Sequence, residues 1–141
     1  MPWDVLYYRA VDDSVPAFDF LLACPTAVRA TMLAVLDAVA AAPPPRFSGG
    51  GLWEAMHGAM HGYYEVRKGG SPNRTQYRLF CLLENPADGS ELRRRGLSQP
   101  AIVVVTGLMK PWMTTLSASD YAAVRALGSD HLEQLPRRIA D

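Results

Sequence analysis

The pattern of apolar and polar positions in the first third of the chain predicts one strand followed by two helices. Residues 3–10 alternate loosely and are rich in aromatic side chains, which favours a strand. A short helix is expected over about 15–23, because Pro16 suits the first turn of a helix. A second helix, about 25–42, ends at three consecutive prolines. Its apolar residues form one helical stripe, which consists of Val28, Met32, Val35, Leu36 and Val39.

The middle of the chain predicts four further strands, separated by turn residues that are rich in glycine. The last of these strands is nearly all apolar, so we expect it to be central and covered on both faces. A turn is expected at 69–73, where glycine, serine, proline and asparagine cluster. The four strands are expected over residues 52–57, 62–67, 75–83 and 101–108.

The last third predicts a polar loop, a helix and a tail. The loop covers residues 85–100 and carries three consecutive arginines. The spacing of Ser117 and Asp120 is that of a capping box, which predicts a helix over about 118–127. Gly128 is then expected as the residue that ends this helix. For the tail, 129–141, the sequence leaves open whether it docks on the domain, extends the helix or frays.

This order of elements predicts a single α+β domain over residues 1–141, with its core at about 5–128. We expect a small, mainly antiparallel sheet of about four to five strands. Two N-terminal helices would pack on one face of that sheet, followed in sequence by a C-terminal helix. The other face of the sheet would remain partly open.

The composition is that of a globular protein, with 49% hydrophobic and 20% charged residues. No apolar run approaches the roughly 20 residues that a membrane-spanning helix needs, and no signal-peptide pattern is present, so we expect a cytoplasmic protein without a membrane partner. Cys24 and Cys81 are expected to be buried thiols. The sequence lacks CxxC and HExxH motifs, so neither a metal site nor a cofactor is expected.

The charges are unevenly distributed along the chain. A net charge of zero argues against a strongly basic nucleic-acid-binding protein. Residues 46–110, however, hold nine Lys and Arg residues against five Asp and Glu residues. The predicted strand region is therefore locally basic, and the local field decides where a polyanion binds.

Three basic residues, Arg67, Arg78 and Lys110, lie on or just after successive predicted strands. A guanidinium within a strand must be hydrated or paired, so three such groups could converge on one anion, for example a phosphate. Simpler interpretations remain open. Glu65 and Arg67 are two residues apart and could form an ordinary ion pair on one strand face, and Arg78 could be an exposed charge on an edge strand.

The order and spacing of these residues resemble the RelE/HigB superfamily of toxins from type II toxin–antitoxin systems, in its phage-derived, HigB-like branch. The resemblance covers about residues 5–128. The early Tyr-Tyr-Arg run and the short helix ending near Cys24 and Pro25 resemble the HigB-like branch. Matches to the family's strand motifs are Tyr64, Glu65 and Arg67, then Tyr77, Arg78, Leu79 and Phe80, then Gly107 and Lys110.

The resemblance implies a RelE-like fold and an endoribonuclease that cleaves mRNA, usually on the ribosome. It also implies neutralisation by a cognate antitoxin, which we expect to be of the helix-turn-helix type. Two other functions stay open. One is inhibition of DNA gyrase by a ParE-like member of the same fold, and the other is a non-catalytic protein that only binds a partner.

Metal-independent RNA cleavage uses the substrate's own 2′-hydroxyl, which attacks the adjacent phosphorus and leaves a 2′,3′-cyclic phosphate. Arg67 and Arg78 are expected to stabilise charge on the phosphate oxygens, and Lys110 to stabilise charge or act as the acid. The residues expected to bind RNA are Arg46, His57, His61, Tyr64, Lys68 and Arg74. The general base stays open among Glu65, His57, His61 and Tyr64.

Overall fold

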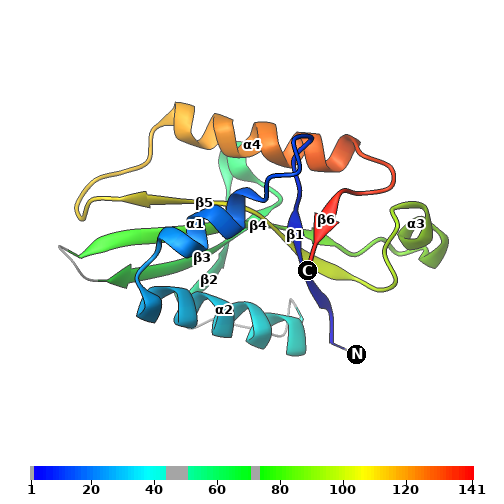
Figure 1. The fold of residues 1–141 in the computed structure, drawn as a ribbon, viewed down its shortest axis with the longest axis horizontal. Coiled ribbons are helices and arrows are strands. Elements are labelled where there is room, and N and C mark those ends of the chain that lie inside the picture. The colour runs from blue at the N-terminus through cyan, green and yellow to red at the C-terminus, as the bar shows by residue number, and fades with distance from the viewer. Residues whose placement is uncertain (1, 44–50, 71–73) are drawn as a thin grey trace.

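The computed structural model describes residues 2–43, 51–70 and 74–141, which form an α+β domain around one sheet (Figure 1). Within these residues the sheet has six strands in the order β2-β3-β4-β5-β1-β6. Neighbouring strands are antiparallel except β1 and β5, which are parallel. The predicted fold class is confirmed. The strands are β1 Asp4–Tyr8, β2 Trp53–Ala55, β3 Tyr63–Gly70, β4 Thr75–Glu84, β5 Ala101–Lys110 and β6 Ile139–Ala140.

Two helices, α1 (Pro16–Ala23) and α2 (Thr26–Ala41), pack on one face of the sheet. All five residues of the predicted apolar stripe of α2 are buried there, so that prediction is confirmed. The α1 helix lies close to β5 because Phe20 packs on Gly107, where a Cβ atom would collide with the Phe20 ring. As expected, β5 is an inner strand with buried side chains on both faces.

The opposite face of the sheet carries α4 (Ala118–Glu133), on the far side from α2 (Figure 1). The helix begins with the predicted capping box of Ser117 and Asp120. The prediction that it ends at Gly128 is wrong. Gly128 lies inside the helix, and its lack of a side chain allows α4 to approach β3, because a Cβ atom there would collide with the Tyr63 hydroxyl oxygen.

The structure also corrects the expected loop at 85–100 and decides the course of the tail. A short helix, α3 (Gly89–Arg94), forms within the loop, with Asp88 accepting a hydrogen bond at its N-terminus. The tail is ordered: its first residues complete α4, and β6 pairs with β1 at the edge of the sheet. A 3₁₀ turn at Gly58–Met60 connects β2 to β3, and β3 continues to Gly70, into the expected turn at 69–73.

Both cysteines, Cys24 and Cys81, are buried free thiols, as predicted. None of the helices in the described part of the chain combines the length and the apolar composition needed to cross a bilayer.

Candidate functional site

Five charged side chains from four neighbouring strands gather on the face of the sheet that carries α4. The strands β3, β4 and β5 extend past the start of α4, so this helix leaves that part of the face uncovered (Figure 1). We call the group the Glu65 cluster. It consists of Glu54 on β2, Glu65 and Arg67 on β3, Arg78 on β4 and Lys110 on β5.

The two arginines of the Glu65 cluster face each other directly across β3 and β4. Like charges in that position destabilise a sheet unless something compensates them. Here two carboxylates do so. Arg78 donates from Nη1 to Glu65 Oε1 at 2.8 Å, and Arg67 donates from Nη1 to Glu54 Oε2 at 2.8 Å. Arg67 Nε also lies 3.5 Å from Glu65 Oε1, which confirms the same-face ion pair that the sequence allowed.

The cluster is partly buried, and the Glu65 carboxylate is its least exposed group. Glu65 is 8% exposed, and the side chains of Arg78 and Arg67 are 12% and 38% exposed. Arg78 Nε is buried and has no hydrogen-bond partner among the described residues. Three basic groups face two carboxylates, so one positive charge is in excess. The site therefore has both the charge and an unused buried donor for an anion.

Lys110 belongs to the same electrostatic group. Its Nζ donates to the carbonyl oxygen of Thr114 at 2.7 Å. Partial burial lowers the pKa of Lys110 below its ordinary value, and repulsion from Arg78 and then Arg67 lowers it further, while Glu65 acts in the opposite direction. A lysine with a lowered pKa gives up its proton more readily, which suits a general acid.

A bulge in β5 places Lys110 on this face. The register of β4 against β5 shifts between Phe80 and Cys81, so that Val105 is an extra residue in β5. Val105 packs under α4, and strict alternation from Val105 would turn Lys110 to the opposite face, toward α1. After the shift Lys110 faces Gln76, which shares a face with Arg78. The bulge therefore completes the cluster.

The structure brings one of the other predicted RNA-binding residues to the edge of the cluster. Arg74 is exposed at the start of β4, with a backbone φ of 56° in the left-handed region. Its guanidinium lies over the ring of Trp112, 4.7 Å from the centroid. Together with Gly69 and Gln76, these two side chains line a shallow pocket. Trp112 is half-exposed.

Two predicted RNA-binding residues lie on the opposite face of the sheet. Tyr64 stacks on Trp53 with ring centroids 5.1 Å apart, next to the core under α1 and α2. Lys68 faces Tyr77, which belongs to that same core. The structure therefore does not bring Tyr64 and Lys68 together with the basic triad, because odd and even positions of β3 project to different faces.

The remaining predicted positions lie away from the triad or cannot be placed. His57 and His61 are exposed and flank the 3₁₀ turn between β2 and β3, where they line one shallow pocket together. Arg46 lies outside the described residues. Of the four candidates for the general base, Glu65 alone is part of the cluster.

Sequence reasoning missed three residues near the site: Glu54, Tyr121 and Arg125. Glu54 faces Glu65 across β2 and β3, and only the register of that hairpin shows this. Tyr121 and Arg125 are four residues apart in a predicted helix, so they share one helix face, and this spacing was a signal that could have been used.

The chemistry of the Glu65 cluster is that of an anion site with a carboxylate at its centre. Arg67 and Arg78 can each donate to phosphate oxygens, Glu65 can accept a proton, and Lys110 can donate one. In the part of the chain that the structure describes, no group of three or more His, Cys, Asp or Glu side chains is arranged to hold a metal ion.

Comparison with known proteins adds no relative to this description. No protein-family model matches the chain, and neither a curated protein nor a solved structure was found to match it.

Proposed function

We propose that the chain is an mRNA endonuclease toxin of the RelE/HigB type and that the Glu65 cluster is its active site. One observation carries the proposal: three basic side chains from three successive strands gather on one face around a carboxylate. The two arginines are paired with Glu54 and Glu65, yet the cluster keeps one positive charge in excess and Arg78 Nε has no partner among the described residues. A phosphate bound between the arginines would use both features.

In the proposed reaction, Arg67 and Arg78 bind the non-bridging oxygens of the scissile phosphate and stabilise the charge that develops there. The ribose 2′-oxygen attacks the phosphorus while its proton passes to the Glu65 carboxylate. The bond between phosphorus and the 5′-oxygen breaks, and the Lys110 ammonium protonates that oxygen. The products are a 2′,3′-cyclic phosphate and a 5′-hydroxyl, and no step in this scheme calls for a metal.

Mutation of Arg78 tests the catalytic assignment. Arg78→Ala should lower RNA cleavage about 10²- to 10³-fold, because it removes a donor that stabilises the transition state. Cleavage is measured with purified protein on RNA alone and on RNA bound to translating ribosomes. Growth arrest after induced expression should be relieved in parallel. Arg93→Ala is the matched control, since Arg93 is exposed on α3 at a distance from the cluster.

Equal toxicity and cleavage in a folded Arg78→Ala variant would refute the assignment. A DNA-damage response without loss of mRNA would point instead to the gyrase-inhibiting, ParE-like alternative.

The pH dependence of cleavage tests the role of Lys110. A general acid must be protonated, so the rate should fall as the pH rises through the pKa of Lys110. Because burial and the two arginines lower that pKa, the fall should begin below the ordinary lysine value of about 10.4. Lys110→Gln should lower the rate and abolish this alkaline limb. An unchanged limb in the variant would show that another group supplies the proton.

A second candidate function is a partner-binding protein without catalysis. It is favoured by the ion pairs that Arg67 and Arg78 already make with Glu54 and Glu65, each at 2.8 Å. These pairs could simply stabilise a charged surface. Complete absence of cleavage, together with partner binding that weakens in Arg78→Ala, would support this candidate.

The proposed toxin would act with a cognate antitoxin, for which we favour the surface of the helical pair. An apolar pocket of about 480 Å³ lies between α1, α2 and β1 and is lined mainly by Tyr7, Phe18, Leu21, Leu22 and Leu33. Leu22 is 74% exposed, and contact of this apolar side chain with water is unfavourable unless a partner protein covers it. Co-expression with a helix-turn-helix protein encoded by a neighbouring reading frame should restore growth, and Leu22→Glu should weaken this rescue.

A further inference from the structure

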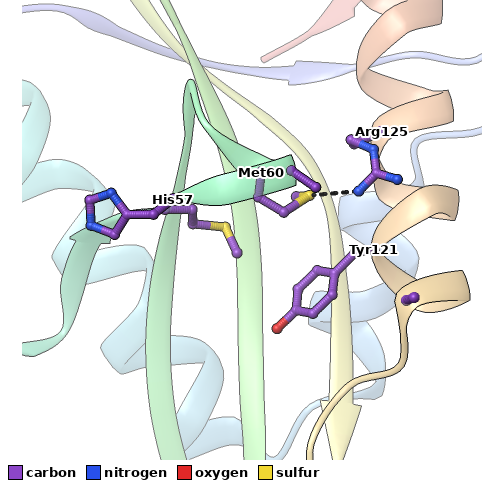
Figure 2. A pocket seen from close by; sticks show the side chains of 7 residues that line it. His57, Met60, Tyr121 and Arg125 are labelled. Carbon is purple, nitrogen blue, oxygen red and sulfur yellow. Dashed lines mark hydrogen bonds between the residues drawn. The ribbon is translucent and has the colours of Figure 1, made fainter.

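A further pocket, of about 370 Å³, opens on the face of the sheet that carries the Glu65 cluster, between α4 and the connection from β2 to β3 (Figure 2). Its volume lies at the lower end of the roughly 300–1,000 Å³ that is typical of small-ligand pockets. Figure 2 shows Tyr121 and Arg125 reaching from α4 toward Met60, while the His57 ring points away from them. The pocket is lined by Met56, His57, Ala59, Met60, Ala118, Tyr121 and Arg125.

Two polar groups in this pocket lack a matching partner. The Arg125 guanidinium makes one hydrogen bond, from Nη1 to the Met60 sulfur at 3.6 Å, and pairs with no carboxylate in the described residues. A guanidinium has five N–H donors, and a thioether is a weak acceptor. The Tyr121 hydroxyl has no hydrogen-bond partner in the described part of the chain either. The pocket therefore offers free donors beside an aromatic ring and two methionine side chains.

The pocket lies next to the Glu65 cluster. The Tyr121 ring packs edge-on against Phe80, with centroids 6.2 Å apart. Phe80 faces Glu65 across β3 and β4 and lies two positions from Arg78 on the same face, a separation of about 7 Å along the strand. Figure 2 shows the Tyr121 hydroxyl pointing away from Arg125 along the sheet. The pocket and the Glu65 cluster are therefore neighbours on one face of the sheet, joined through Phe80.

We propose that this pocket binds the unpaired base of the nucleotide next to the phosphate held by the Glu65 cluster, and that it prefers guanine. The proposal rests on the proposed function and names its sequence preference. Proteins read single-stranded RNA by stacking bases on aromatic rings and by hydrogen bonds to base edges, and Tyr121 and Arg125 offer one of each. The fork of an arginine matches the O6 and N7 acceptors of guanine, whereas adenine presents a donor in place of O6.

Binding of short RNAs to the full chain tests the proposal. The probes are fluorescein-labelled hexamers of uridine with one internal guanine or one internal adenine, methylated at every 2′-oxygen so that they resist cleavage. Fluorescence anisotropy should give about tenfold tighter binding of the guanine hexamer, since a bidentate arginine contact discriminates bases by roughly that amount or more. Arg125→Gln should remove the preference, and Arg93→Gln, the matched surface control, should keep it.

Variants of Tyr121 separate stacking from hydrogen bonding. Tyr121→Ala should weaken binding of both hexamers about tenfold, because stacking on an aromatic ring stabilises a bound base of either kind. Tyr121→Phe keeps the ring and should retain that contribution. Circular dichroism and melting curves check that each variant folds. A guanine preference that is absent in the native protein, or that persists in folded Arg125→Gln, would overturn the proposal.

The failure of this proposal can be told apart from the failure of the proposed function. If the native chain binds guanine through Arg125 but cleaves no unmethylated RNA, the pocket assignment stands and the nuclease assignment falls. If RNA is cleaved without dependence on guanine or Arg125, the nuclease assignment stands and the pocket assignment falls.

Discussion

Two charged groups on this sheet use the same residue types but differ in how they are enclosed. The first is the Glu65 cluster. The second, which we call the Glu84 cluster, consists of Glu84, Glu91, Arg95, His131 and Arg137. Glu84 ends β4 and is 1% exposed. Its carboxylate accepts from Arg137 Nε at 2.9 Å and from Arg95 Nη1 at 3.3 Å, and Arg95 also binds Glu91.

The difference lies in how far each cluster is enclosed. In the Glu84 cluster the C-terminal tail carries Arg137 to Glu84, and the two side chains are only 5% and 1% exposed. Arg137 Nη2 also donates to Glu84 Oε1 at 3.4 Å, and its Nη1 donates to the carbonyl oxygens of Leu132 and Gln134. The Glu65 cluster stays partly open, and Arg78 Nε there has no hydrogen-bond partner among the described residues. The comparison teaches that enclosure, more than residue type or net charge, distinguishes a structural ion network from a candidate binding site.

The contrast between the two clusters is tested most directly by replacing the central carboxylate of each, Glu84 and Glu65. Glu84→Gln should lower the free energy of unfolding by about 3–5 kcal/mol, because it leaves the buried Arg137 guanidinium without its counter-charge. Glu65→Gln should cost about 2 kcal/mol or less, since Arg67 keeps Glu54 and the site reaches water. Urea unfolding of both variants measures the difference. Equal losses would show that the two clusters are not distinct in kind.

Acid should destabilise the folded protein through His131, which belongs to the Glu84 cluster. Burial, opposed by Glu84 and reinforced by Arg137, lowers the pKa of His131 to about 4, with smaller opposing effects from Asp130 and Arg95. The unfolded histidine titrates near pH 6.5, so between about pH 6.5 and 4 the unfolded state binds a proton that the folded state does not. This group's contribution to stability is therefore complete above about pH 6.5 and falls by about 3 kcal/mol as the pH drops to 4.

Urea unfolding at several pH values measures this effect. Because carboxylates also titrate in this range, the informative quantity is the difference between the native chain and His131→Phe, which should have the flatter profile. His57→Phe alters an exposed histidine and is the matched control. Identical profiles for the native chain and His131→Phe would contradict the prediction.

The smallest effect on stability is expected at Glu54, at the edge of the Glu65 cluster. Glu54→Gln should change the free energy of unfolding by less than about 1 kcal/mol, because the Arg67–Glu54 pair is largely exposed. It should nevertheless strengthen binding of a single-stranded oligonucleotide, since the excess positive charge rises. The affinity should also fall more steeply with added salt. Weaker binding in Glu54→Gln would mean that Glu54 is needed to orient Arg67.

The sequence predicted the helices better than the pairing partners of charged residues. The stripe of α2 and the capping box of α4 were readable because both depend on residues within one or two turns. The end of α4 was misplaced because Gly128 was taken as a helix stop. Its actual role is steric and involves Tyr63, which lies far away in the sequence.

The candidate site was predictable only in part, for the same reason. Arg67 and Arg78 could be named from their strands, but Tyr64 and Lys68 could not be assigned a face without knowing which side of β3 carries α4. Glu54, Tyr121 and Arg125 reach the site through the hairpin register and the position of α4, which no local pattern specifies.

The sequence by itself determined which segments are strands and helices, that they form one α+β domain, and that basic residues concentrate on its strands. These features follow from periods of 2 and 3.6 residues, which are local properties of the chain. The tertiary structure decided which charges meet. A single bulge at Val105 turns Lys110 toward Arg78, and the closing tail brings Arg137 to Glu84 across 53 residues. Strand register and long-range packing set such contacts, because one extra residue reverses the face of every position that follows it.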